Sequence, residues 1–249
     1  MTLDAATPPI DLTPYSRSAN RLLAAVRRRD FDLIEPHLAP IDLVKGQVLF
    51  EPGDDVVTTY FPGSRTMVSL LIVTRDGREV EAATIGREGA VGGIVSAGNK
   101  PAYGRAVVTI PGVALAVPTA TLETIKAASP AFADLFSRYA DALLAQLMQS
   151  VACNALHSVE ARASRWLLAT HDRAGEAIIH LTQESLAEML GVQRTTVTGV
   201  VHTLEERGLI RRHRGRVEVI DRRGLERQTC ECYAAVEEHF AKLLPEVTL

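Results

Sequence analysis

The sequence predicts an α+β chain in three parts: a small antiparallel β-roll, one long amphipathic helix, and two short helices followed by a β-hairpin. Three observations favour this order. Short apolar runs between glycine and proline turns fill the first half, an apolar period of three and four residues begins near Pro130, and a glycine turn separates two short amphipathic segments in the last third. At 249 residues the chain is long for one core and short for three, so we expect two domains.

The composition is that of an ordinary globular protein. Apolar residues make up 47% and charged residues 23%, which excludes a disordered or collagen-like chain. The longest apolar runs, such as residues 67–73, are far shorter than the roughly 20 residues that a bilayer span needs. Residues 1–20 lack the basic start and apolar run of a signal peptide, and three cysteines cannot form a disulfide framework. We therefore expect a cytoplasmic protein that does not bind membranes.

The N-terminal half predicts the β-roll. Residues 1–20 contain three prolines and are expected to form an arm, and residues 21–128 are expected to form the roll after short helices near residues 20–26 and 31–37. Asp76-Gly77 between two apolar runs is the strongest hairpin signal. Many short strands without long intervening helices are typical of a small antiparallel barrel or roll.

Residues 129–157 predict one long helix, because neither glycine nor proline occurs between Ala131 and Arg173. Its apolar stripe is too apolar to leave in water, and its spacing suits a seam between two helices. We expect a homodimer through Phe132, Phe136, Tyr139, Leu143, Leu147 and Val151. The alternative is that this stripe packs on the β-roll of its own chain.

Residues 158–249 contain the most informative motif. Thr182 is a good N-cap with Glu184 in the first turn, and Gly191 is placed to end this helix in the left-handed conformation. A second helix starts near Arg194. Two short helices joined by a tight glycine turn form a helix-turn-helix, whose second helix can enter the major groove of DNA.

The hairpin of residues 210–220 follows directly and resembles a wing. Its arginines place several phosphate-neutralising charges beside the second helix. The predicted DNA-binding residues are Thr182, Ser185, Arg194, Thr195, Thr196, Thr198, Gly199, His202, Arg211, Arg212, Arg214 and Arg216. One alternative is that these are solvated polar residues on an ordinary helical hairpin. The other is a ligand-binding signalling module whose winged helix contacts protein rather than DNA.

Over nearly its whole length the sequence resembles the Crp/Fnr-type bacterial transcription regulators. The resemblance rests on Lys45-Gly46-Gln-Val-Leu-Phe50, on the helix with Arg162, Trp166 and Leu167, and on Gly191-Val-Gln-Arg-Thr-Thr-Val197. It implies a cyclic-nucleotide-binding-like β-roll, a dimerisation helix and a winged helix-turn-helix. It also implies a homodimer that binds a pseudo-palindromic operator in double-stranded DNA, and that contacts RNA polymerase if it activates transcription.

The recognition helix departs from the family pattern. Members with the commonest operator carry Arg, Glu and a second Arg there, whereas this sequence keeps Arg194 and has Thr195 and Gly199 at the other two positions. We therefore expect a different operator.

The effector segment also departs from the family pattern. The resemblance implies effector contacts from Glu88, Gly89, Ala90, Val91, Gly92, Arg105 and Ala106. Ala90 stands where the ribose-binding carboxylate is expected, so cyclic AMP is not the predicted effector. An unidentified small molecule and operation without a ligand both remain open.

The sequence predicts no metal site, no bound cofactor and no enzyme activity. Cys230-Glu-Cys232 lacks the second pair that a four-ligand site needs, and Cys153 on the long helix is expected to be a packing residue. No nucleophile and base occur at usable spacing.

Overall fold

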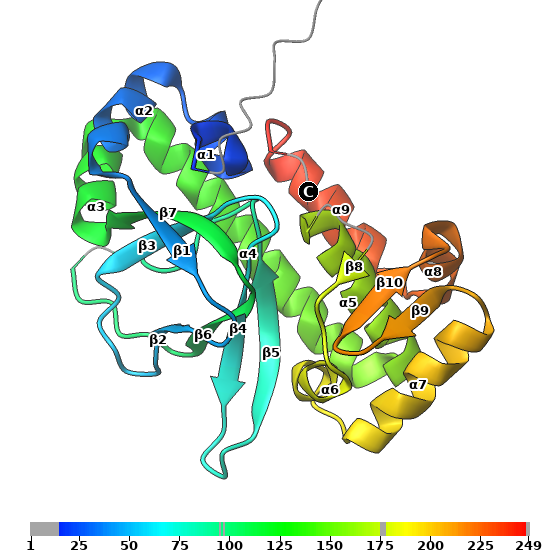
Figure 1. Cartoon of the computed structure of the whole chain (residues 1–249). Helices are drawn as coiled ribbons and strands as arrows, with labels where there is room; N and C mark the ends of the chain where they lie inside the picture. Colours follow the sequence, from blue (N-terminus) through cyan, green and yellow to red (C-terminus); the bar gives the residue numbers. More distant parts are fainter. Residues whose placement is uncertain (1–14, 95, 97, 175–177, 248–249) are drawn as a thin grey trace, which may run out of the picture.

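The computed structural model describes residues 15–94, 96, 98–174 and 178–247, so most of the predicted arm of residues 1–20 lies outside it. The chain has the predicted α+β architecture. The β-roll lies on one side, the winged helix lies on the other, and the long helix α4 (Pro130–Leu156) runs between them (Figure 1). Within the described ranges, no helix has the length and apolar character needed to span a bilayer.

Short helices precede the roll: η1 (Arg17–Ala19), α1 (Arg21–Ala25), α2 (Arg28–Ile34) and η2 (Glu35–His37). Asn20 both caps α1 and fixes it to the roll. Its side chain accepts a hydrogen bond from the backbone of Leu23 at 2.9 Å and donates to the carbonyls of Pro62 and Gly89 at 2.9 and 2.8 Å.

The roll consists of two antiparallel sheets ordered β1-β7-β3 and β2-β6-β4-β5. The strands are β1 (Ala39–Leu43), β2 (Val48–Phe50), β3 (Thr58–Pro62), β4 (Met67–Val73), β5 (Glu79–Ile85), β6 (Arg105–Ile110) and β7 (Gly112–Pro118). Strands β4 and β5 form the predicted hairpin, and Gly77 at its turn has a φ of 81° that favours glycine. Buried side chains such as Val68, Ile85 and Val108 fill the space between the sheets.

Helix α3 (Thr119–Ala128) leads into α4. The predicted dimer stripe on α4 has two parts that differ in burial. In the first part, Phe132, Phe136 and Tyr139 are at most 2% exposed within the core of their own chain. In the second part Val151 is exposed, whereas Leu143 and Leu147 are half-buried. The first three residues of the stripe therefore pack within their own chain, as in the alternative to a dimer contact, and they are not on an exposed face of α4.

The C-terminal part begins with α5 (Val159–Ala174) and contains a small sheet ordered β8-β10-β9. Its remaining elements are β8 (Ile178–Ile179), α6 (Gln183–Leu190), α7 (Arg194–Glu206), β9 (Ile210–His213), β10 (Arg216–Val219), α8 (Arg222–Gln228) and α9 (Cys232–Leu243). Helix α9 returns along α4 (Figure 1). Phe240, Leu244 and Val247 thereby join the same core as Phe132 and Leu22.

Candidate nucleic-acid interface

Helices α6 and α7 form the predicted helix-turn-helix. The Thr182 hydroxyl caps α6 by accepting from the backbone N–H of Ser185 at 3.1 Å, and Gly191 ends this helix at φ 63° and ψ 37°. Apolar side chains of the two helices share one buried cluster and fix their angle: Leu186, Ala187, Leu190, Val197, Val201 and Leu204. The opposite face of α7 is therefore held in place without contributing to the core.

This outer face of α7 carries the predicted base-reading residues, all of them exposed: Arg194, Thr195, Thr196, Thr198, Gly199 and His202. Arg194 lies 3.4 Å from Glu184, and both side chains are more than half exposed, so this ion pair contributes at most about 1 kcal/mol. Nothing lies within 4 Å of the position that a Cβ on Gly199 would take. The face is open, and packing within the chain does not require glycine at this position.

The wing arginines divide into two kinds. Arg211 pairs with Glu218 at 3.4 Å, and the backbone N–H of Arg212 donates to Glu205 at 2.8 Å. That backbone bond, supported by the Arg212 guanidinium, lowers the pKa of Glu205 and joins β9 to α7. Arg214 and Arg216 are exposed at the hairpin turn and form no ion pair with any residue that the structure describes.

Thr182 and Ser185 lie at the start of α6, and their hydroxyl oxygens are 2.9 Å apart. Thr182 is exposed, whereas Ser185 is half-buried and lines a cavity of about 250 Å³ between the roll and the helix-turn-helix. Of the two, Thr182 is therefore better placed to reach a phosphate.

The predicted effector residues have partners within the chain. Glu88 is buried and pairs with Arg173 of α5 at 2.7 Å, while Arg105 pairs with Glu51 at 2.8 Å and also bonds Glu79. Burial lowers the pKa of Arg173, but the Glu88 carboxylate outweighs this effect and the pKa is raised.

Helix α4 covers the rest of this segment. The Tyr139 hydroxyl donates to the carbonyl of Ala90 at 3.1 Å, and a Cβ on Gly89 would lie 2.1 Å from that hydroxyl. Val91, Gly92 and Ala106 lie in the same packed region of the roll, and Ala106 is fully buried. A ligand at this segment remains a prediction, and Glu88 would have to leave Arg173 to reach it.

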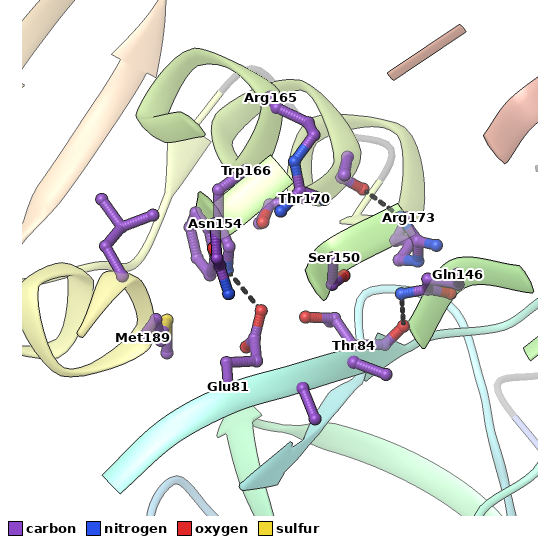
Figure 2. A pocket seen from close by; sticks show the side chains of 14 residues that line it. Glu81, Thr84, Gln146, Ser150, Asn154, Arg165, Trp166, Thr170, Arg173 and Met189 are labelled. Atoms are coloured by element: carbon purple, nitrogen blue, oxygen red, sulfur yellow. Dashed lines mark hydrogen bonds between the residues drawn. The ribbon is translucent and has the colours of Figure 1, made fainter. Parts of the chain in front are cut away.

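A polar cavity of about 30 Å³ marks the contact between the roll and the C-terminal segment (Figure 2). Glu81 and Thr84 of β5 face Trp166 of α5 and Gln146 of α4. The Trp166 Nε1–H donates to Glu81 at 2.8 Å, and the Gln146 amide donates to the carbonyl of Thr84 at 3.2 Å. These bonds give the two parts a direct connection through which their relative position can be set.

The structure also brings together four residues that the sequence does not indicate as one site: Cys153, His157, Cys230 and Cys232. Their ligand atoms all lie within 4.8 Å of one another. The sequence shows two short spacings, Cys230-Glu-Cys232 and Cys153 four residues before His157, but not that these pairs meet, because they lie more than 70 positions apart.

Comparison with known proteins supports the reading of the C-terminal segment. Residues 161–228 match the model of the Crp-like helix-turn-helix domain. A search of curated proteins finds no match.

Many solved structures share the fold. FixK2 from Bradyrhizobium japonicum aligns with a TM-score of 0.67 at 15% identity, over 78% of this chain and 98% of that protein. The c-di-GMP responsive global regulator CLP of Xanthomonas campestris gives 0.63 at 16% identity, over 78% and 99%. A CRP-family transcriptional regulator from Thermus thermophilus gives 0.62 at 19% identity, over 76% and 95%. The chain thus has the fold of Crp/Fnr-type regulators, with a Crp-like helix-turn-helix domain.

Proposed function

We propose that this chain, with its Crp-like helix-turn-helix at residues 161–228, is a homodimeric, sequence-specific DNA-binding transcription regulator. The observation that carries the proposal is an open polar face on α7 beside two exposed wing arginines, Arg214 and Arg216, which form no ion pair with the residues that the structure describes. A helix with an open polar face can read base edges, and arginines beside it can neutralise DNA phosphates. If the protein activates transcription, RNA polymerase is its further partner.

The second half of α4 supports a homodimer. Leu144, Met148 and Val151 are 53%, 65% and 71% exposed, and Ala155 continues the same row. Their spacing of four, three and four residues is that of a two-helix seam. A twofold axis along this seam would present two α7 helices to successive major grooves, about one helical turn apart. The operator would then be a pseudo-palindrome.

Arg194→Ala tests base reading by α7. Since a guanidinium at the start of a recognition helix can bond guanine in two places, we expect a loss of roughly 1–3 kcal/mol per half-site and a relaxed preference at one base pair. The measurement is the affinity for a selected operator and for each of its single-base variants. Arg27→Ala, which removes an exposed arginine beside α2, is the matched control. Equal losses on specific and nonspecific DNA would exclude base reading by Arg194 and leave Thr195, Thr198 or His202 to perform it.

Arg216→Ala tests phosphate contact by the wing. We expect a similar loss of affinity on all sequences, and a slope of log affinity against log salt that is shallower by about one unit. The reason is that Arg216 is exposed and forms no ion pair within the described part of the chain, so its charge can neutralise a phosphate. Binding titrations at several salt concentrations measure this slope, again beside Arg27→Ala. An unchanged slope would remove the wing from the DNA interface.

A further inference from the structure

We propose that Cys153, His157, Cys230 and Cys232 bind one zinc ion in a closed tetrahedral site between the end of α4 and the start of α9. The proposal rests on the fold and does not depend on DNA binding.

The distances between the ligand atoms suit a single ion. The Sγ atoms of Cys153 and Cys230 are 3.6 Å apart, and the Sγ of Cys232 is 3.4 Å from Nδ1 of His157. Zinc bonds of about 2.3 Å to sulfur and 2.0–2.1 Å to nitrogen place the three thiolates and the imidazole nitrogen of a tetrahedral site about 3.5–3.8 Å from one another. Small side-chain movements would therefore complete the zinc site. The four ligand atoms lie too close together to surround an iron–sulfur cluster.

The local structure explains why these residues meet. Cys153 and His157 are four residues apart at the end of α4, so they lie on one face of the helix. Cys230 and Cys232 flank Glu231 where α9 begins. Two pairs of ligands are thus presented by two elements that pack against each other.

The chemistry of the four ligands favours zinc. Three thiolates and an imidazole form the Cys₃His set of structural zinc sites, and four protein ligands leave no open position for catalysis. The cysteines are at most 8% exposed and form a small cluster of their own, separate from the large apolar cores, with Ala161 beside them. Among the described residues, no large apolar side chain belongs to this cluster, so apolar packing alone contributes little there.

Two neighbouring side chains fit an outer shell of such a site. With Nδ1 facing Cys232, the other ring nitrogen of His157 lies 3.2 Å from the Glu231 carboxylate. Metal-bound histidines commonly direct their second nitrogen to a carboxylate in this way. The Gln149 amide is 3.0 Å from the Sγ of Cys232 and can donate to a thiolate there.

The position of the site gives it a structural role. His157 is the C-cap of α4, and only Ser158 separates it from α5. An ion bound here would fix the joint at which the long helix meets the DNA-binding segment, and would hold α9 to that joint. Zinc would therefore limit how far the recognition helices can move relative to α4.

Elemental analysis of the full-length protein, purified with reductant and without chelator, tests the proposal first. We expect one zinc per chain, and three thiols per chain that react with a thiol reagent only after chelation. Cys232→Ser and His157→Gln should reduce the zinc content to background, whereas the exposed His239→Gln on the same helix should retain it. Zinc at background in the unsubstituted protein, or a Cys153–Cys230 disulfide formed in its place under these conditions, would overturn the proposal.

Cobalt(II) added to the metal-free, reduced protein tests the geometry without relying on a variant that folds poorly. We expect the strong visible bands of a tetrahedral cobalt thiolate, saturating at one equivalent. Glu231→Gln should weaken cobalt affinity by roughly tenfold, the low end for an outer-shell carboxylate, because Glu231 is 78% exposed. A weak octahedral spectrum, or an affinity that Glu231→Gln does not change, would contradict the proposed coordination. Because these measurements need no DNA, their failure is distinct from a failure of the proposed function.

Discussion

The double substitution Met148→Lys, Val151→Lys should convert the protein to monomers and weaken operator binding by about 100-fold or more. Both native side chains are exposed on the second half of α4, where we expect a two-helix seam to bury them. Burying the charged lysine side chains there would be costly, so the seam should not form. A monomer engages one half-site, and loses the increase of roughly 10²–10⁴ that linking two binding modules provides. Sedimentation or light scattering measures the mass, and binding titrations measure the affinity.

Val57→Lys is the matched control for this pair, because Val57 is 65% exposed in the loop between β2 and β3 of the roll, outside α4 and the winged helix. It should leave mass and DNA affinity unchanged, and circular dichroism should show that every variant folds. A Met148→Lys, Val151→Lys protein that remains dimeric would place the dimer contact elsewhere.

Arg173→Ala should reduce the free energy of unfolding by roughly 3–5 kcal/mol. Arg173 and Glu88 have side chains only 4% exposed, and the substitution leaves the Glu88 carboxylate buried without its counter-charge. The remaining bond to this carboxylate comes from the backbone N–H of Gly86 at 3.0 Å, which compensates for only part of the lost pair. Urea unfolding measures the effect.

Two variants separate the cost of an unpaired charge from ordinary loss of contact. Arg28→Ala removes an exposed pair with Asp32 and should cost at most about 1 kcal/mol. Combining Arg173→Met with Glu88→Gln removes both charges and should recover part of the stability lost in Arg173→Ala. A loss below about 1 kcal/mol for Arg173→Ala would contradict the expected cost of leaving the Glu88 carboxylate buried without its partner.

Local sequence patterns predict much of the fold. Short apolar runs with turns indicate the roll, Asp76-Gly77 marks the β4–β5 hairpin, and Thr182 and Gly191 delimit α6 within one residue. These features depend on residues close together in the chain, so periodicity and capping reveal them. The Crp-like domain match at residues 161–228 confirms the prediction of a helix-turn-helix.

Contacts between distant segments are what the sequence does not reveal. The period of α4 gives an apolar stripe but not which part of it the β-roll covers, so Phe132 and Val151 look alike in sequence and differ from 1% to 71% in exposure. Likewise, Cys153 and Cys230 are 77 positions apart, and their meeting depends on α9 returning along α4. The pairing of Glu88 with Arg173 has the same long-range origin.

Selection of genomic fragments by the purified protein, followed by a salt titration of those retained, measures DNA recognition most directly. We predict that a defined subset is retained, that it shares a pseudo-palindrome with half-sites about one helical turn apart, and that log affinity falls linearly and steeply with log salt concentration. If no fragment is retained at low salt, the winged helix does not bind DNA, and the protein is instead a signalling module in which α7 and the wing contact another protein.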